Sequence, residues 1–203
     1  TNDPGAEIKG FGDEFIALLA KQLPSTEQRD KAKAPTEFKL TPVALDQVYD
    51  NQNKPLQIER TKRAQHRCRG KNRVKANQKK ESYTDPSDPR NISGVETDHT
   101  IAMSTYMYAM KNFLVRFAWF FPSMKPASTA DGIHRYVHRE RAAGRVTIAT
   151  DYSRFDGTIS AYLKQLEWRI YTRLFGWSEK LNTLIEGDSN CDAKTKHGVR
   201  YNT

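Results

Sequence analysis

The sequence predicts a helix-rich α+β fold. Five segments carry apolar residues at steps of three and four, which is typical of helices that pack by one face. One short β-branched and apolar run, at residues 146–149, indicates a single buried strand. The chain has 203 residues, which is enough for one or two domains with a core of their own.

The first helical pattern lies within residues 1–24. Its apolar residues follow Gly12-Asp13 and are Phe15, Ile16, Leu18, Leu19 and Leu23. Pro24 ends the run, because proline cannot continue a helix. A polar connector follows, and residues 42–51 are expected to form a short helix.

Two further helices are expected in the middle of the chain. The first is capped by Thr97 or Asp98 and runs to about Phe121. The second covers residues 129–143, with Gly144 as its C-terminal stop. The apolar residues expected to point inward from this second helix are Ile133, Tyr136 and Val137.

The clearest change of period follows these helices. Residues 146–149 lie between the charged residues Arg145 and Asp151, and they are expected to form a short buried strand. A last helix begins after Gly157, and Gly176 closes it. Its apolar positions are Ile159, Leu163, Leu166, Ile170 and Leu174.

The positive charge is concentrated in one segment. Lys and Arg number 33 against 24 Asp and Glu, so the net charge is +9. Ten basic residues lie between residues 60 and 80, where there is no acidic residue: Arg60, Lys62, Arg63, Arg67, Arg69, Lys71, Arg73, Lys75, Lys79 and Lys80. Such a block favours a nucleic acid or a nucleoside triphosphate as partner, although a solvated tail or localisation signal has the same composition. Its charges show no helical sidedness, so an extended or irregular segment is expected.

Several classes of protein are excluded. The longest uncharged stretch, residues 99–110, is too short to cross a membrane, and no signal-peptide pattern opens the chain. Cys68 and Cys191 cannot build a disulfide framework, while His134 and His138 lack a third metal ligand nearby. The chain begins with threonine, and we interpret it as a fragment of a longer protein.

Two carboxylates lie on either side of a turn directly after the expected strand. Asp151 would sit at the carboxyl end of that strand, where a rigid element can hold a ligand of Mg²⁺. Asp156 lies five residues further on, and Gly157 would allow the backbone to approach a ligand closely. From the residues alone, an equal alternative is that Asp151 forms a turn and Asp156 caps the next helix.

Three stretches resemble motifs of one enzyme family. Residues 150–160, T-D-Y-S-R-F-D-G-T-I-S, resemble motif A of viral RNA-dependent RNA polymerases of the nodavirus-like and tombusvirus-like groups. Residues 79–83 and 88–93 look like the basic motif F of the same family, and residues 193–203 resemble the approach to its motif B. The order matches the family across about residues 72–203.

The resemblance implies part of a right-hand polymerase. Residues 1–144 would form a portion of the fingers, and residues 145–203 would form the start of the palm. The activity implied is Mg²⁺-dependent (or Mn²⁺-dependent) nucleotidyl transfer by an RNA-directed RNA polymerase during viral RNA replication. The partners implied are an RNA template and product strand, nucleoside triphosphates and the remainder of the polymerase.

The motif A resemblance assigns roles to four residues. Asp151 takes the position of the carboxylate that binds the catalytic metal. Asp156 takes the position beside the 2′-hydroxyl of the incoming ribose, where a carboxylate can favour ribonucleotides. The backbone around Tyr152 and Ser153 would lie beside the triphosphate.

The motif F resemblance places positive charge over the nucleotide channel. Lys79 and Arg90 match best and are expected on the triphosphate, with Lys80 as the alternative to Lys79 because the two lysines are adjacent. Arg73 and Lys75 would line the template or nucleotide channel without specificity, or lie on a solvated loop.

The sequence also departs from the family pattern. The Ser/Gly-rich part of motif B and the Gly-Asp-Asp of motif C have no counterpart, since Gly187-Asp188-Ser189 comes too early and is expected to lie in a loop. The chain is therefore expected to be inactive alone. Two alternatives remain: a non-catalytic basic RNA-binding module, and a cellular Mg²⁺-dependent phosphoryl-transfer enzyme in which the aspartate after the strand occurs by chance. The family also implies the host cytoplasm, with membrane-associated replication complexes reached through regions outside this chain, because no transmembrane segment is expected here.

Overall fold

The computed structural model describes residues 6–22, 39–64, 73–82, 84–86, 90–117, 119–122, 124–151, 159–189 and 191–202. The described part is α+β and rich in helix, as the sequence predicts. Its elements are α1 (Ala6–Gln22), α2 (Leu45–Asp50), α3 (Pro55–Ala64), β1 (Arg73–Gln78), β2 (Asn91–Gly94), α4 (Thr97–Leu114), α5 (Pro126–Ala142), α6 (Ala161–Phe175), α7 (Glu179–Ser189), β3 (Asp192–Thr195) and β4 (Arg200–Asn202). None of the described helices combines the length and the apolar character that a membrane crossing needs.

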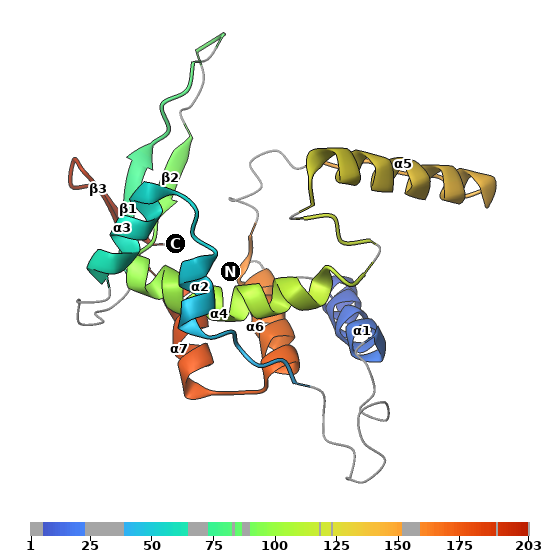
Figure 1. The fold of residues 1–203 in the computed structure, drawn as a ribbon, viewed down its shortest axis with the longest axis horizontal. Coiled ribbons are helices and arrows are strands. Elements are labelled where there is room, and N and C mark those ends of the chain that lie inside the picture. Colours follow the sequence, from blue (N-terminus) through green and yellow to red (C-terminus); the bar gives the residue numbers. More distant parts are fainter. Residues whose placement is uncertain are drawn as a thin grey trace.

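Helix α4 is the centre of the helical layer, and four other helices pack around it (Figure 1). Ile101 packs with buried residues of α2 and α3. Tyr106 packs with α6 and α7, and its ring meets Phe175 edge-on at 5.1 Å between centroids. Phe113 packs against Leu174 of α6, which is 1 % exposed. The apolar stripe of α4 is thus wide enough to bury two separate pairs of helices.

The four strands form one small mixed sheet in the order β2-β1-β3-β4. Strands β1 and β2 are an antiparallel hairpin, β3 and β4 are a second antiparallel pair, and β1 pairs with β3 in parallel. Strand β1 buries alternate residues, Val74 and Ala76, while Arg73 and Lys75 are exposed. None of these strands was expected from the sequence, and the first part of the basic block forms helix α3 rather than an irregular segment.

The strand expected at residues 146–149 is wrong. Residues 145–150 have no regular secondary structure, and Val146 and Ile148 are 87 % and 78 % exposed. A strand is stable only beside another strand, and the sheet of the described residues contains β1 to β4 alone. The start of the segment is instead held to the end of α5, because Arg145 forms an ion pair and a hydrogen bond with Glu140. These contacts lower the pKa of the Glu140 carboxyl.

Helix α5 differs from expectation in its burial. It forms as predicted but begins at Pro126, at the first helical position where proline is favoured. No residue of α5 is buried, and the expected inward residues Ile133 and Tyr136 are 47 % and 41 % exposed. The helix projects away from the sheet, as Figure 1 shows. Its apolar residues therefore have too few neighbours to form the expected packed face.

Three other expectations need correction. Helix α4 ends at Leu114 rather than near Phe121, and Glu96 is its N-cap residue instead of Thr97 or Asp98. Glu96 makes no side-chain capping bond, and Thr97 and Asp98 are the first residues of the helix itself. No side-chain cap therefore marks where α4 begins. The stretch of residues 187–189 is the last turn of α7, not a loop.

Helix α7 was not expected from the sequence, whereas three other helices agree with it. Helices α1, α2 and α6 occupy the expected segments, and α6 ends at Gly176 with a φ of +77° that favours glycine. Gly12 is the point of close approach between α1 and α6, because a β-carbon there would stand 2.0 Å from the Tyr162 hydroxyl oxygen. Arg169 of α6 also binds Asp13 of α1 at 2.7 Å.

Tyr171 gives the fold a pH dependence. Burial raises the pKa of its phenol above the ordinary value of 10.0, and the charges of Glu167 and Asp188 act in the same direction. The contribution of the neutral Tyr171 phenol to the free energy of unfolding is fully present below pH 10. It is lost as the pH rises above 10, because Tyr171 ionises in the unfolded chain while the phenol in the folded chain stays neutral. We expect the free energy of unfolding to fall less between about pH 9 and pH 11 in Tyr171→Phe than in the unchanged chain.

Urea unfolding at the two pH values measures this difference. Tyr136→Phe is the control, because that ring lies on α5 and is 41 % exposed. Equal losses in the unchanged chain, Tyr171→Phe and Tyr136→Phe would contradict the assignment to Tyr171.

Candidate functional site

The loop end of the β1–β2 hairpin brings two of the predicted site residues together. The backbone amide of Lys79 donates to the carbonyl of Arg90 at 2.8 Å, which extends the ladder one step past the strands. The Lys79 ammonium pairs with the carboxylate of Glu81, and the guanidinium of Arg90 lies 3.7 Å from the same carboxylate oxygen. Residues that are distant along the loop thus converge on one acidic group.

This arrangement holds two cations without burying them. The side chains of Lys79 and Arg90 are 36 % and 64 % exposed, so their ion pairs with Glu81 are solvated and weak. A phosphate group carries more charge than one carboxylate and can replace Glu81 as the partner of both cations. The adjacent Lys80 is exposed and forms no ion pair within the described part of the chain, so the hairpin distinguishes the two lysines by their contacts.

Arg73 and Lys75 lie in β1, away from the loop end of the hairpin. Both side chains are exposed on one face of β1, while the intervening Val74 is 4 % exposed and packs with Cys191 and Ala193 of the neighbouring segment. A groove of about 1020 Å³ follows β1, β3 and β4. Its basic lining residues are Arg73, Lys75, Lys194, Lys196 and Arg200, and its acidic ones are Glu96 and Asp192. The groove therefore carries an excess of positive charge.

Tyr201 connects the two halves of the sheet. Its ring reaches from β4 to β2, where its hydroxyl accepts from the Asn91 amide at 2.9 Å and shares a hydrogen bond with Ser93 at 3.0 Å. The ring crosses β3 and β1 on the face that carries Ala193 and Ala76, which are 1 % and 4 % exposed. Small side chains at these positions leave room for the aromatic ring.

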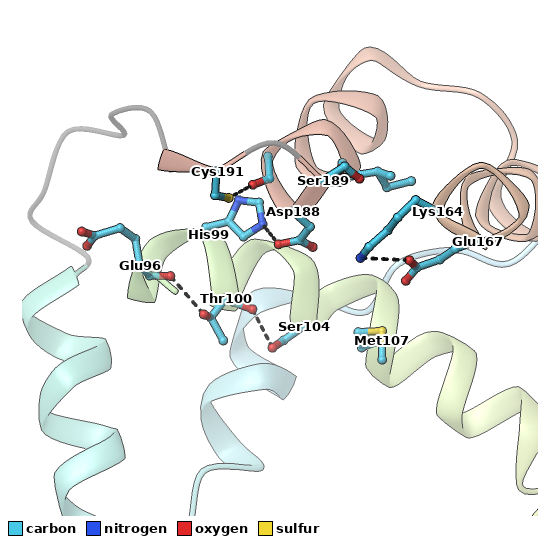
Figure 2. A network of polar contacts seen from close by, with 12 residues as sticks. Glu96, His99, Thr100, Ser104, Met107, Lys164, Glu167, Asp188, Ser189 and Cys191 are labelled. Atoms are coloured by element: carbon cyan, nitrogen blue, oxygen red, sulfur yellow. Dashed lines mark hydrogen bonds and ion pairs between the residues drawn. The ribbon is translucent and has the colours of Figure 1, made fainter. Parts of the chain in front are cut away.

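Polar contacts between α4 and α7 fix the place where β3 begins (Figure 2). The Nε2 atom of His99 lies 2.7 Å from an oxygen of Asp188, and the His99 side chain is 11 % exposed. The thiol of Cys191 donates to the carbonyl of Gly187. Because Cys191 directly precedes β3, these contacts orient β3 toward β1.

Asp151 lies outside the sheet. It follows the exposed residues 145–150 in the connection between α5 and α6, and it is itself exposed. Tyr152, Ser153 and Asp156 lie outside the described residues. Among the residues that the structure does describe, no group of three His, Cys, Asp or Glu side chains is placed to hold a metal ion. The structure therefore brings Lys79 and Arg90 together, while Asp151 lies outside the sheet, in the connection between α5 and α6.

The sequence reasoning missed Glu81, Lys194, Arg200 and Tyr201. Basic and apolar residues alternate in R-V-K-A at residues 73–76, which is a strand signal. The many basic residues on both sides made this alternation difficult to recognise. Gly198, with a φ of +89° between β3 and β4, is the corresponding sign of a tight turn. No local pattern gives the parallel pairing of β1 with β3, because its partners are distant in sequence.

Comparison with known proteins finds similar viral enzymes. The chain is 34 % identical over 164 residues to the RNA-directed RNA polymerase of greasy grouper nervous necrosis virus and 33 % over 164 residues to that of striped jack nervous necrosis virus. It is 30 % identical over 174 residues to that of Pariacoto virus. The chain is related to the nodaviral RNA-directed RNA polymerases.

The matches cover 79 %, 79 % and 85 % of this chain. The chain spans 16 % of the length of each of these polymerases, so it corresponds to one segment of them. No family model and no solved structure matches the chain.

Tyr201→Phe tests the connection between β4 and β2. The ring would keep its packing, but the hydrogen bonds to Asn91 and Ser93 would be lost. We expect the free energy of unfolding in urea to fall by about 1–2 kcal/mol, since each net hydrogen bond contributes roughly 1 kcal/mol. Tyr49→Phe is the control, because the Tyr49 hydroxyl forms no hydrogen bond within the described part of the chain. A loss of equal size in both variants would contradict the connection.

Proposed function

We propose that this chain is part of an RNA-directed RNA polymerase that performs Mg²⁺-dependent nucleotidyl transfer in viral RNA replication. The observation that carries the proposal is the similarity of about four-fifths of the chain to nodaviral enzymes of that name. In this proposal residues 1–144 belong to the fingers and residues 145–203 begin the palm of a right-hand polymerase. The sheet would then connect the two regions, since β1 lies in the first and β3 in the second.

Lys79 and Arg90 would bind the triphosphate of the incoming nucleotide. Both cations already meet at one carboxylate, so little side-chain freedom is lost when a phosphate replaces it. The planar guanidinium of Arg90 can hold two phosphate oxygens, while the ammonium of Lys79 acts as a point charge. Positive charge at this position stabilises the negative charge that develops on the leaving pyrophosphate.

Asp151 would hold Mg²⁺ or Mn²⁺. Its exposed carboxylate is a hard oxygen ligand, and Mg²⁺ sites commonly use one or two carboxylates together with substrate phosphates and water. When bound, the metal supplies charge stabilisation for the attacking and leaving oxygens. Asp156 would accept a hydrogen bond from the ribose 2′-hydroxyl, and the backbone of Tyr152 and Ser153 would lie beside the triphosphate. The resemblance of motif A supports these roles.

The 203 residues would act with the remainder of a longer polymerase and would be inactive alone. The support is that the related enzymes are about six times longer than the matched segment. The partners would be the RNA template, the product strand and nucleoside triphosphates. Replication would take place in the host cytoplasm, including membrane-associated complexes. The positively charged groove alone would also suit a non-catalytic RNA-binding module, and the two experiments below separate these functions.

The first experiment compares the two adjacent lysines in the intact polymerase that contains this chain. We expect Lys79→Met to raise the KM for nucleoside triphosphates by about tenfold or more, since a charged hydrogen bond to phosphate contributes roughly 1.5–3 kcal/mol. Lys80→Met is the matched control and should change KM less than about twofold. Steady-state incorporation of labelled nucleotides measures both. A larger effect at Lys80 would reverse the assignment.

The second experiment concerns the metal ligand. Asp151→Asn should reduce nucleotide incorporation by about a thousandfold or more, because the amide cannot replace an anionic metal ligand. The midpoint of thermal unfolding should stay unchanged, since the side chain is exposed. Asp131→Asn, on the exposed face of α5, is the control and should retain full activity. Near-normal incorporation by Asp151→Asn would exclude the metal assignment and favour the non-catalytic module.

A further inference from the structure

Three basic residues stand side by side across the sheet. Lys75 of β1 is in register with Lys194 of β3, and Lys194 is in register with Arg200 of β4. All three side chains are exposed. Within the part of the chain that the structure describes, none of the three forms an ion pair. We call these residues the cross-strand row.

Such a row is unfavourable for the sheet itself. Residues opposite each other on neighbouring strands have β-carbons about 4.5–5.5 Å apart, and like charges at that spacing repel. The adjacent rung is different, because Arg73 is in register with the acidic Asp192. The sheet thus places opposite charges at one rung and three like charges at the next. A polyanion lying across the strands would remove the repulsion.

We propose that the cross-strand row binds the sugar-phosphate backbone of a single RNA strand that crosses the sheet at right angles to the strands. The inference rests on the proposed function and adds Lys194 and Arg200 to its RNA-binding residues. One row of cations, spaced about 4.8 Å from strand to strand, matches one phosphate backbone rather than the two of a duplex. The groove along these strands carries five basic residues against two acidic ones, which extends the favourable potential beyond the row.

Strand β2, at the edge of the sheet, does not obstruct an RNA strand that follows the cross-strand row. Gly94 of β2 is in register with Lys75, so the row continues onto a position without a side chain. The described side chains on the same face are Arg73, Lys75, Asn77, Ile92, Asp192, Lys194 and Arg200. Since none of these is aromatic, the face offers no surface on which bases can stack. The row therefore binds phosphates and does not read sequence.

The test measures binding of this chain to a fluorescent oligouridylate over a range of salt concentrations. The triple variant is K75Q/K194Q/R200Q. We expect its plot of log affinity against log salt to be less steep by about 2, because each phosphate contact on a single strand contributes about 0.7 to the slope. The matched control K125Q/R141Q/K180Q removes three exposed charges outside the groove and should leave the slope unchanged. Equal changes in both triple variants, or no change in either, would overturn the proposal.

Three further measurements separate the possible errors. The midpoint of thermal unfolding of K75Q/K194Q/R200Q should stay the same or rise, because repulsion has been removed; a fall would mean that lost binding reflects lost structure. Excess ATP should not displace the RNA; displacement would assign the row to a triphosphate. A duplex of the same length should give a slope change no larger than the single strand does, and a larger change would overturn the single-strand assignment.

The outcomes also distinguish this inference from the proposed function. Lys79→Met should leave the salt slope of RNA binding unchanged, since it acts on the nucleotide. If Lys79→Met and Asp151→Asn impair incorporation while the triple variant binds RNA normally, only the cross-strand row is wrong. If the triple variant loses RNA binding while Asp151→Asn stays active, the row holds and the metal assignment fails.

Discussion

The parallel pairing of β1 with β3 is the contact on which the rest of the sheet depends. It joins residues 73–76 to residues 192–195, and helices α4 to α7 lie between them in the sequence. A parallel pair always needs such a crossover, and here the packing of α6 and α7 on α4 returns the chain to the sheet. Closing this long loop costs entropy, which the buried contacts around Val74 and Ala193 offset.

Of the described helices, α1, α2, α4, α5 and α6 were predictable, whereas α3, α7 and the strands were not. Helix α6 shows why: its apolar steps are long and regular, and Gly176 gives an unambiguous end. Strands β3 and β4 are only four and three residues long, which is too short for a period to stand out. The run at residues 146–149 has strong β propensity but no partner among the described strands, so its composition alone was misleading.

For the candidate site, the residue types could be predicted from the sequence, but their arrangement in space could not. Its cations could be named from the sequence, because resemblance to a family gives residue types at fixed spacing. Their geometry could not, since the meeting of Lys79 and Arg90 at Glu81 depends on the path of the loop between the two strands. The contribution of Lys194 and Arg200 depends on sheet register, and a shift of one residue would place both on the opposite face. Register is a tertiary property that no local window contains.

The exposed residues at 146–149 have a consequence for the behaviour of the chain in solution. Val146 and Ile148 present β-branched side chains to water on a backbone whose amides are not engaged in a described ladder. Such an edge is a template for pairing with an identical edge of a second molecule. Charged residues at both ends of the segment, Arg145 and Asp151, oppose this pairing as gatekeepers. The exposed β-branched run thus favours self-association as the concentration rises, and the two flanking charges limit it.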